Sequence, residues 1–241
     1  MCLIKRFHFK KIDSTSAFIK RRRSLMGDFT FVSADYQSAG RGRTGRSWES
    51  VPGENLMFSI LIKDKELVSK FGLLSVASAV AVMNAVKKLG VKGVSVKWPN
   101  DVYINGKKTC GILLEGVTIK GELKEVVIGI GLNVNQTEFC SVLHKATSLK
   151  LESGKDFKVK DVKKLVYKEI KATFYSLKSS DYAIEEAIKN DYLKGKTVFS
   201  ELCGEKKEVT VLGINRDGTL KVSFEEKELD VMSGEITFHV E

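Results

Sequence analysis

The stretch from Asp35 to Trp48 reads Asp-Tyr-Gln-Ser-Ala-Gly-Arg-Gly-Arg-Thr-Gly-Arg-Ser-Trp and lies between two predicted strands. Three glycines and three arginines fall within the seven residues from Gly40 to Arg46. Glycine allows close backbone approaches that a Cβ atom forbids, and arginine offers a rigid fork of donors to phosphate or carboxylate oxygens. Arginines so close together would repel each other unless an anion or carboxylates neutralised them. The stretch predicts a loop that folds over an anion, although it lacks the lysine and helix start of a P-loop.

The composition is that of a soluble globular protein. The 241 residues are 43% hydrophobic and 29% charged, which suits one large domain or one medium and one small domain. The most apolar stretch, from Phe71 to Val86, is too short and too polar to span a bilayer. Because the N-terminus has no apolar signal region, we expect a cytoplasmic protein with no membrane partner.

The cysteines and histidines point away from metal chemistry. Cys2, Cys110, Cys140 and Cys203 are far apart and form no Cys-x-x-Cys pair, which argues against a zinc site and a disulfide framework. The three histidines lie outside the glycine-rich and polar clusters. We therefore expect no protein metal ligands and no histidine base.

The net charge of +10, from 40 basic and 30 acidic residues, fits nucleic acid, a membrane surface or an acidic partner. Much of this charge is diffuse lysine, as between Lys158 and Lys171, which is typical of a solvated helix face. A nucleic-acid-binding module therefore stays as an alternative of a different class.

The pattern up to residue 194 predicts an α+β domain with a mixed or antiparallel sheet. Strands are expected at residues 3–12, 29–36, 55–62, 94–97, 102–104, 109–115 and 125–133. Helices are expected from Asp13-Ser14-Thr15 to Gly27 and at residues 66–89, 161–178 and 181–193. The turn Asn105-Gly106 predicts a hairpin, and Gly129 and Gly131 indicate that something approaches their strand closely.

The pattern changes at Gly195. Five short alternating strands are expected at residues 197–202, 208–214, 220–224, 228–232 and 236–240. They predict a small β-barrel of SH3-like size. The expected domains are residues 1–194 and 195–241.

Several of these clusters together resemble one family. Gln37 to Trp48, Lys97 to Asp101, Lys107 to Glu115 and Gly129 to Asn133 resemble, in order and spacing, the motifs of biotin–protein ligases. Asp13-Ser14-Thr15 resembles that family's opening motif, and residues 233–236 resemble its C-terminal barrel. The resemblance implies a catalytic domain with a mixed sheet flanked by helices, like class II aminoacyl-tRNA synthetases, followed by an SH3-like barrel.

The resemblance also implies the chemistry. Biotin would react with ATP, with Mg²⁺, to give biotinyl-5′-AMP and pyrophosphate. A lysine of a biotin carboxyl carrier protein, as in acetyl-CoA carboxylase, would then take the biotinyl group. A carboxylate nucleophile needs no base, and arginines and a lysine can stabilise the phosphate charge that develops. This chemistry agrees with the motifs named above, which contain arginines and lysines but no histidine.

The resemblance assigns roles to particular positions. The catalytic residues would be Lys108, Arg43 and Asp101. The biotin-binding residues would be Ser14, Thr15, Ser16, Gln37, Gly40, Arg41, Gly42, Arg43, Lys108 and Gly111. The nucleotide-binding residues would be Arg43, Thr44, Arg46, Trp48, Asn100, Lys108 and Asn133. Lys108 would bind the biotin carboxyl and the α-phosphate, and Asp101 would accept a hydrogen bond from the acceptor lysine.

Some positions depart from the family pattern, namely Ser16, Thr44 and Cys110, but none removes a charged group. The first strand begins within a few residues of Met1, so we expect a monofunctional ligase without a helix-turn-helix domain and without DNA as a partner. A homodimer is a further expectation. The nearest rival enzyme is a lipoate–protein ligase, against which the Gly-Arg-Gly-Arg loop and the Lys97 to Asp101 run favour biotin.

Overall fold

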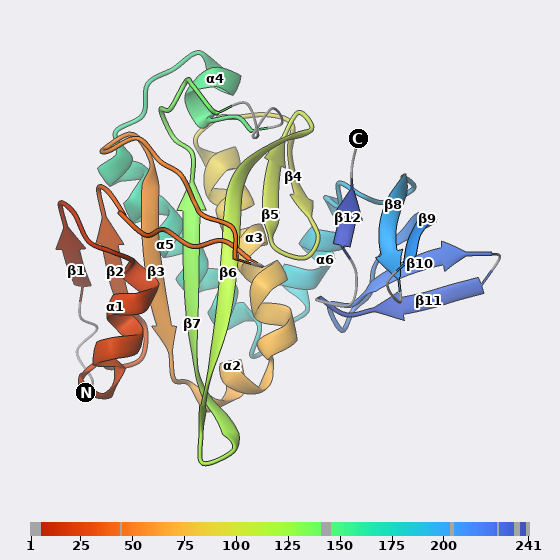
Figure 1. The fold of residues 1–241 in the computed structure, drawn as a ribbon, viewed down its shortest axis with the longest axis horizontal. Helices are drawn as coiled ribbons and strands as arrows, with labels where there is room; N and C mark the ends of the chain where they lie inside the picture. The colour runs from red at the N-terminus through yellow and green to blue at the C-terminus, as the bar shows by residue number, and fades with distance from the viewer. Residues whose placement is uncertain are drawn as a thin grey trace.

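The computed structural model describes residues 6–43, 45–140, 146–202, 205–225, 227–233 and 237–239, with the backbone alone described at 200–202, 205–206 and 237–239. Two sheets organise the chain (Figure 1): a seven-stranded mixed sheet and a five-stranded antiparallel sheet. The predicted α+β class is therefore confirmed.

The large sheet has the strand order β1-β2-β3-β7-β6-β5-β4. Only β1 and β2 run parallel, and the other neighbours are antiparallel. The strands are β1 Arg6–Phe9, β2 Thr30–Ala34, β3 Leu56–Ile62, β4 Val94–Lys97, β5 Asp101–Ile104, β6 Lys107–Ile119 and β7 Glu122–Leu132. The predicted hairpin between β5 and β6 turns at Asn105 and Gly106, whose φ angles of 49° and 81° are left-handed.

The helices cover both faces of this sheet. They are α1 Thr15–Arg22, the short 3₁₀ helix η1 Arg23–Leu25, α2 Lys65–Ser69, α3 Phe71–Lys88, α4 Leu149–Ser153, α5 Val159–Ser176 and α6 Tyr182–Lys189. Side chains alternate along β3, so Ile60 and Ile62 pack in the core under α3 and α5, whereas Leu61 packs on the opposite face beside Ile19 of α1. Thus α1 is held on the face opposite α3.

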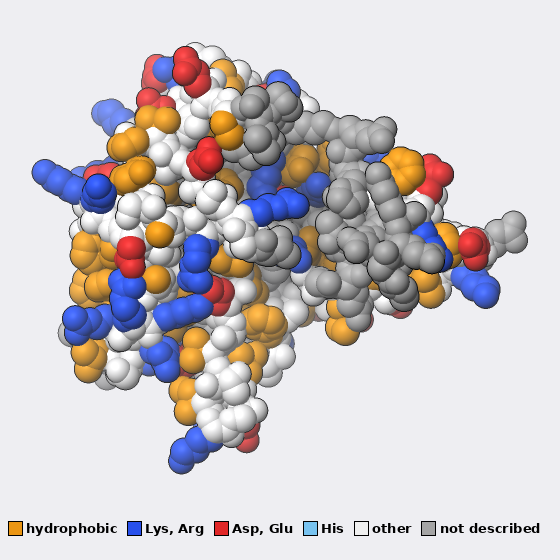
Figure 2. Space-filling model, viewed as in Figure 1, with side chains coloured by type: hydrophobic (Ala, Val, Ile, Leu, Met, Phe, Trp, Pro, Cys, Tyr) orange, Lys and Arg blue, Asp and Glu red, His pale blue; other side chains and the backbone are white. Residues whose placement is uncertain are grey.

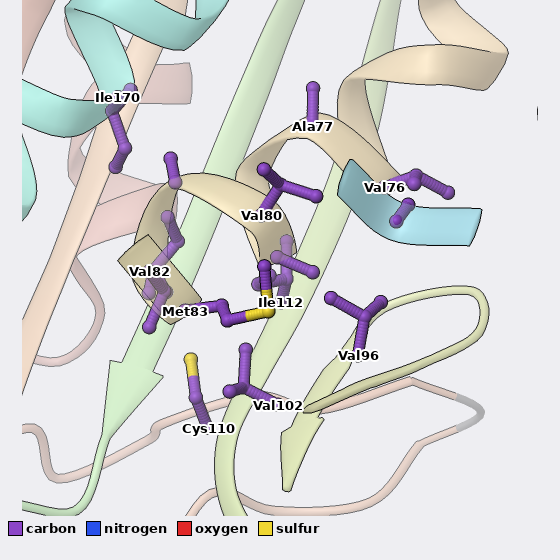
Figure 3. Packing of buried hydrophobic residues seen from close by; sticks show 14 of the residues in the cluster. Val76, Ala77, Val80, Val82, Met83, Val96, Val102, Cys110, Ile112 and Ile170 are labelled. Atoms are coloured by element: carbon purple, nitrogen blue, oxygen red, sulfur yellow. The ribbon is translucent and has the colours of Figure 1, made fainter. Parts of the chain in front are cut away.

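The helix α3 forms the centre of the main core. Figure 3 shows Val80 and Met83 of α3 beside Val102, Cys110 and Ile112 of the strands. The helix also has the length and mean hydropathy, 1.3 over 18 residues, of a membrane span, but 61% of that window is buried inside the protein. Its apolar character is explained by packing against the sheet.

The predicted single helix at residues 66–89 is wrong in one respect, because it is two helices that meet at Lys70. The Asp64 carboxylate caps α2 by accepting from the Glu66 and Leu67 amides, both at 3.1 Å. Lys70 leaves the helical conformation, and its ammonium donates to the carbonyl of Leu177 at the end of α5. The break between the two helices therefore coincides with a contact between segments that are distant in the sequence. The short helix α4 was not predicted.

The small sheet has the order β11-β10-β9-β8-β12. Its strands are β8 Thr197–Leu202, β9 Glu205–Ile214, β10 Leu220–Phe224, β11 Lys227–Val231 and β12 Thr237–His239. The five predicted strands are confirmed. Within the ranges described, β11 and β12 are not paired, so the closed barrel stays a prediction. The buried indole of Trp98, directly after β4, donates to the Gly218 carbonyl between β9 and β10 at 2.8 Å and so joins the two sheets.

Candidate active site

A cavity of about 350 Å³ lies between the Asp35–Trp48 stretch, the start of α1 and the strands β3, β5, β6 and β7. The predicted site residues that line it are Ser14, Thr15, Ser16, Gln37, Arg41, Gly42, Arg43, Arg46, Trp48, Asn100, Asp101, Lys108, Gly111 and Asn133. Gly40 is not part of the lining, and Thr44 lies outside the described residues. The fold therefore gathers residues that are up to 119 positions apart along the chain, from Ser14 to Asn133.

One end of the cavity is built from uncharged side chains. Gln37 Oε1 accepts from the Thr15 amide at 2.7 Å and from Thr15 Oγ1 at 2.9 Å. Ser59 Oγ lies 2.7 Å from Thr15 Oγ1 and 2.8 Å from Ser16 Oγ. A hydroxyl has one proton to donate. Because Thr15 donates to Gln37, Ser59 must donate to Thr15 and Ser16 to Ser59, so the hydroxyls form a directed chain.

Ser59 was missed by the sequence reasoning. It is fully buried in the middle of β3, within Leu-Met-Phe-Ser-Ile-Leu-Ile. A single buried hydroxyl in a strongly apolar strand needs partners, and this was the available signal. Gly129 lies opposite Ser59 on β7, and a Cβ there would come within 2.8 Å of Ser16 Oγ. Gly129 thus makes room for the hydroxyl cluster.

The loop between β2 and β3 folds as a small hairpin. Gly42 N donates to Arg46 O at 2.7 Å, Trp48 N donates to Gly40 O at 3.0 Å, and Gly45 turns the chain with φ of +74°. A Cβ on Gly40 would lie 2.7 Å from the Trp48 carbonyl oxygen. Gly40 is therefore required by the loop's own backbone, although it does not line the cavity.

The loop's arginines bind side chains of the sheet. Arg43 Nη1 donates to Asn100 Oδ1 at 2.8 Å, and Asn100 Nδ2 donates to the Ile112 carbonyl at 2.8 Å. Arg41 Nη2 donates to Glu115 Oε2 at 3.0 Å. The predicted need for a neutralising group is thus met in part by Glu115, to which the sequence reasoning gave no role.

Trp48 closes the hairpin over a pair of glycines. Gly111 of β6 and Gly131 of β7 are register partners. A Cβ on Gly131 would lie 2.3 Å from Trp48 Cε2, and one on Gly111 would lie 2.9 Å from Trp48 Cζ3. The predicted close approach to this strand is therefore confirmed, and the approaching group is the indole. Its Nε1 is buried and has no hydrogen-bond partner among the residues described.

The other end of the cavity is charged. Lys108 Nζ lies 2.7 Å from Asp101 Oδ1, with side chains that are 35% and 15% exposed. Asp101 begins β5, Lys108 lies near the start of β6, and a register shift between Val102 and Tyr103 separates the two parts of this ladder. A lysine ammonium is a compact cation that suits an anionic group, and the adjacent carboxylate can accept a proton or a hydrogen bond.

Two neighbours of Asp101 are kept neutral. Burial, with the Asp101 carboxylate nearby, raises the pKa of the Cys110 thiol well above its usual value. The same two causes raise the pKa of the Tyr103 phenol, whose oxygen accepts from Lys97 Nζ at 3.1 Å. Cys110 belongs to the buried core under α3.

The segment after β7 also contributes to the cavity. Asn133 Nδ2 donates to the Thr147 carbonyl at 3.0 Å, and the Thr147 amide donates to the Lys108 carbonyl at 2.8 Å. Phe139 and Ala146 line the cavity. The sequence reasoning missed both because this segment has no periodic pattern. Asn133 is buried and holds the segment in place as well as facing the cavity.

Comparison with known proteins decides the family. Residues 9–133, just over half of the chain, match the model of the biotin/lipoate A/B protein ligase family. The chain belongs to this family. The matched part begins in β1 and ends directly after β7, so it holds most of the residues that line the cavity.

Curated relatives of this family include the "Bifunctional ligase/repressor BirA" of Bacillus subtilis, which is 41% identical over 128 residues, 52% of this chain and 39% of that protein. The "Biotin--[acetyl-CoA-carboxylase] ligase" of Mycobacterium tuberculosis is 36% identical over 129 residues, 51% of this chain and 47% of that protein. The match thus spans less than half the length of these relatives.

A solved structure of the same family is similar over nearly the whole fold. The biotin protein ligase from Aquifex aeolicus, in complex with biotin and ATP, superposes with a TM-score of 0.84 at 30% identity. The superposition covers 98% of this chain and 99% of that one. The small C-terminal sheet is therefore included in the structural similarity.

Proposed function

We propose that this chain is a biotin–protein ligase. It would join biotin to ATP, forming biotinyl-5′-AMP and pyrophosphate, and then transfer biotin to a lysine of a biotin carboxyl carrier protein. The observation that carries the proposal is one cavity with two unlike ends: the neutral chain of Ser16, Ser59, Thr15 and Gln37, and the charged end at Lys108. Biotin has the same polarity, with a neutral urea ring and a carboxylate.

In the first step, a biotin carboxylate oxygen would attack the α-phosphorus of ATP and pyrophosphate would leave. Lys108 and Arg43 line the cavity and, with Arg46, would neutralise the charge that builds up on the phosphate oxygens. Before the reaction, Lys108 pairs with Asp101 and Arg43 with Asn100, so both cations are already positioned by a partner. A positioned donor needs little reorganisation when charge develops.

In the second step, the acceptor lysine amine would attack the acyl carbon and AMP would leave. The amine must lose protons during this step. Asp101 is the candidate acceptor because its carboxylate faces the cavity beside Lys108. Trp48 and Arg46 would contact the nucleotide.

We propose ATP and biotin as substrates, with Mg²⁺ arriving bound to the ATP phosphates. In the described part of the chain, no three His, Cys, Asp or Glu side chains lie together as a metal site. The cavity does offer the carboxylates of Asp101 and Glu49. Mg²⁺ is commonly held by one or two carboxylates plus substrate phosphates, so this donor set fits a phosphate-bound ion.

Pyrophosphate exchange into ATP tests the proposal. Exchange that depends on biotin, followed by labelling of a carrier domain at its lysine, is the expected result. Exchange with lipoate alone would instead establish the rival lipoate–protein ligase, which the family also includes. Salt-dependent binding of DNA or RNA without biotin-dependent exchange would establish the nucleic-acid-binding alternative.

Partners and setting follow from the same proposal. Lys and Arg side chains gather on the face that carries α1 (Figure 2), and this face would favour an acidic carrier domain. If so, kcat/KM for carrier biotinylation falls with rising ionic strength, and a kcat/KM that does not change would refute electrostatic attraction of the carrier domain.

We further propose a cytoplasmic setting, a homodimer and closure of the C-terminal strands into an SH3-like barrel.

A further inference from the structure

Glu115 lies on β6 beside the Gly/Arg loop, which comprises residues 40–46. Its carboxylate contacts two cations that come from different elements. Arg41 Nη2 of the loop lies 3.0 Å from Oε2, and the Lys20 ammonium of α1 contacts Oε1. The Glu115 side chain is 16% exposed, whereas that of Arg41 is 44% exposed. Glu115 and Lys20 are thus fixed on regular elements, and Arg41 is the member that can leave.

In the described part of the loop, two side-chain contacts and one packed indole hold it to the sheet. Arg41 binds Glu115 and Arg43 binds Asn100, while Trp48 covers the glycine pair at the loop's end. A second cavity of about 350 Å³ lies beside the loop, lined by loop residues with Leu113 and Glu115. At Arg41 and Arg43 the loop is therefore held to the sheet by polar side-chain contacts rather than by apolar packing.

Lys20, the third charged side chain at this position, makes the contact between Arg41 and Glu115 reversible. A mostly buried carboxylate without a partner is strongly unfavourable. Lys20 continues to pair with Glu115 when Arg41 moves away, so opening of the loop leaves no unpaired charge. An exposed arginine contributes only modestly to such a pair, so the loop can open and close readily.

We propose that Glu115 is a positioning residue that latches the Gly/Arg loop closed through Arg41, with Lys20 as its permanent counter-ion. The latch slows the escape of the acyl-adenylate from the cavity. The statement about the adenylate rests on the proposed function, whereas the latch does not. The two can therefore be tested separately.

The first test measures loop opening in the free protein. Trypsin cleavage after Arg43 and Arg46, followed by mass spectrometry, is compared between the wild type and Glu115→Gln. The amide keeps the shape and removes the charge, and we expect loop cleavage to become roughly three- to tenfold faster. Unchanged cleavage would overturn the latch.

Glu125→Gln is the matched control. Glu125 also joins two cations, Arg23 Nε at 3.2 Å and Lys63 Nζ at 3.1 Å, and its side chain is 10% exposed. It lies on β7 and contacts no loop residue among those described. A general loss of stability would raise cleavage in both variants, whereas the latch predicts faster loop cleavage only in Glu115→Gln.

The second test substitutes Arg41, the exposed residue of the Arg41–Glu115 pair. Arg41→Gln and the double variant Arg41→Gln/Glu115→Gln should open the loop as much as Glu115→Gln alone, because all three remove one contact. Additive effects would overturn the direct contact. Arg41 is exposed, so Arg41→Gln tests the latch even where Glu115→Gln does not fold.

The third test measures release of biotinyl-AMP after loading with biotin and ATP. We expect Glu115→Gln to release it roughly three- to tenfold faster, with the amount formed in one turnover unchanged. Faster cleavage with unchanged release would overturn the role in retention. If the wild type forms no biotinyl-AMP, the proposed function fails, and the cleavage assays still decide the latch.

Discussion

The two ends of the cavity are built in opposite ways. The neutral end joins Thr15, Ser16 and Ser59 on a helix and a strand, all three buried and hydrogen-bonded to one another. The charged end depends on Lys108, Asp101 and the arginines of a loop that is largely exposed. Neutral hydroxyls tolerate burial when they are paired, whereas charges need solvent or counter-ions nearby. The buried neutral end therefore suits recognition, and the more exposed charged end suits chemistry on charged groups.

The largest effect is expected at the charged end. Lys108→Ala removes the cation that faces the proposed phosphate position, and we expect adenylate synthesis to fall by about 100-fold or more. Lys107→Ala is the control, because its side chain is exposed and lies outside the cavity lining. Biotin-dependent pyrophosphate exchange measures the effect, and an unchanged Tm shows that the fold is kept. Wild-type rates in Lys108→Ala would refute the assignment.

A change at the neutral end should affect a different quantity, the affinity for biotin. Ser59→Ala breaks the hydroxyl chain and leaves Thr15 and Ser16 without their shared partner, so we expect biotin to bind about tenfold more weakly. The KM for ATP should not change. Ser33→Ala, a buried serine on β2 that contacts His8, controls for general destabilisation. Titration calorimetry with biotin measures Kd, and an equal loss for ATP would contradict the separation of the two ends.

A smaller effect is expected where the loop meets the sheet. In Gly131→Ala the added methyl would lie 2.3 Å from Trp48 Cε2, so the indole must shift. We expect the KM for ATP to rise about fivefold, with little change in biotin affinity. Gly72→Ala is the control, because a Cβ at Gly72 meets nothing within 4 Å. An unaltered tryptophan emission spectrum in Gly131→Ala would show that the indole had not moved.

The smallest effect is expected just outside the neutral end. Arg21 hydrogen-bonds Asp13 at 2.6 and 3.0 Å, which lowers the pKa of that carboxyl to about 2. A lowered folded pKa stabilises the protein above the unfolded pKa, and this contribution is lost as pH falls toward 2. Because the pair is exposed, Asp13→Asn should lower Tm at pH 7 by only about 1 °C. The difference between the two proteins should shrink from pH 5 downward, and a difference that grew there would contradict the pairing.

The sequence was sufficient to predict the role of residues that act on their immediate neighbours in the chain. Ser14 caps α1 through its own hydroxyl, and Asn105-Gly106 turns the β5–β6 hairpin through left-handed φ angles. Ser59 and Glu115 were given no role because their partners lie far away in the chain. The Thr15–Ser59 contact spans 44 residues and the Arg41–Glu115 contact 74. Contacts of that range depend on strand order, which short-range patterns do not encode.

By itself, the sequence determined the α+β class and the five C-terminal strands, through alternation along strands and helix caps that act within a few residues. It also named half of the residues that line the cavity, most of them through the resemblance of its motifs to a known family. Only the tertiary structure decided that β7 lies between β3 and β6. That order brings Gly129 opposite Ser59 and Gly131 opposite Gly111. One strand thereby borders both the hydroxyl cluster and Trp48, because register places side chains that are distant in sequence on one face.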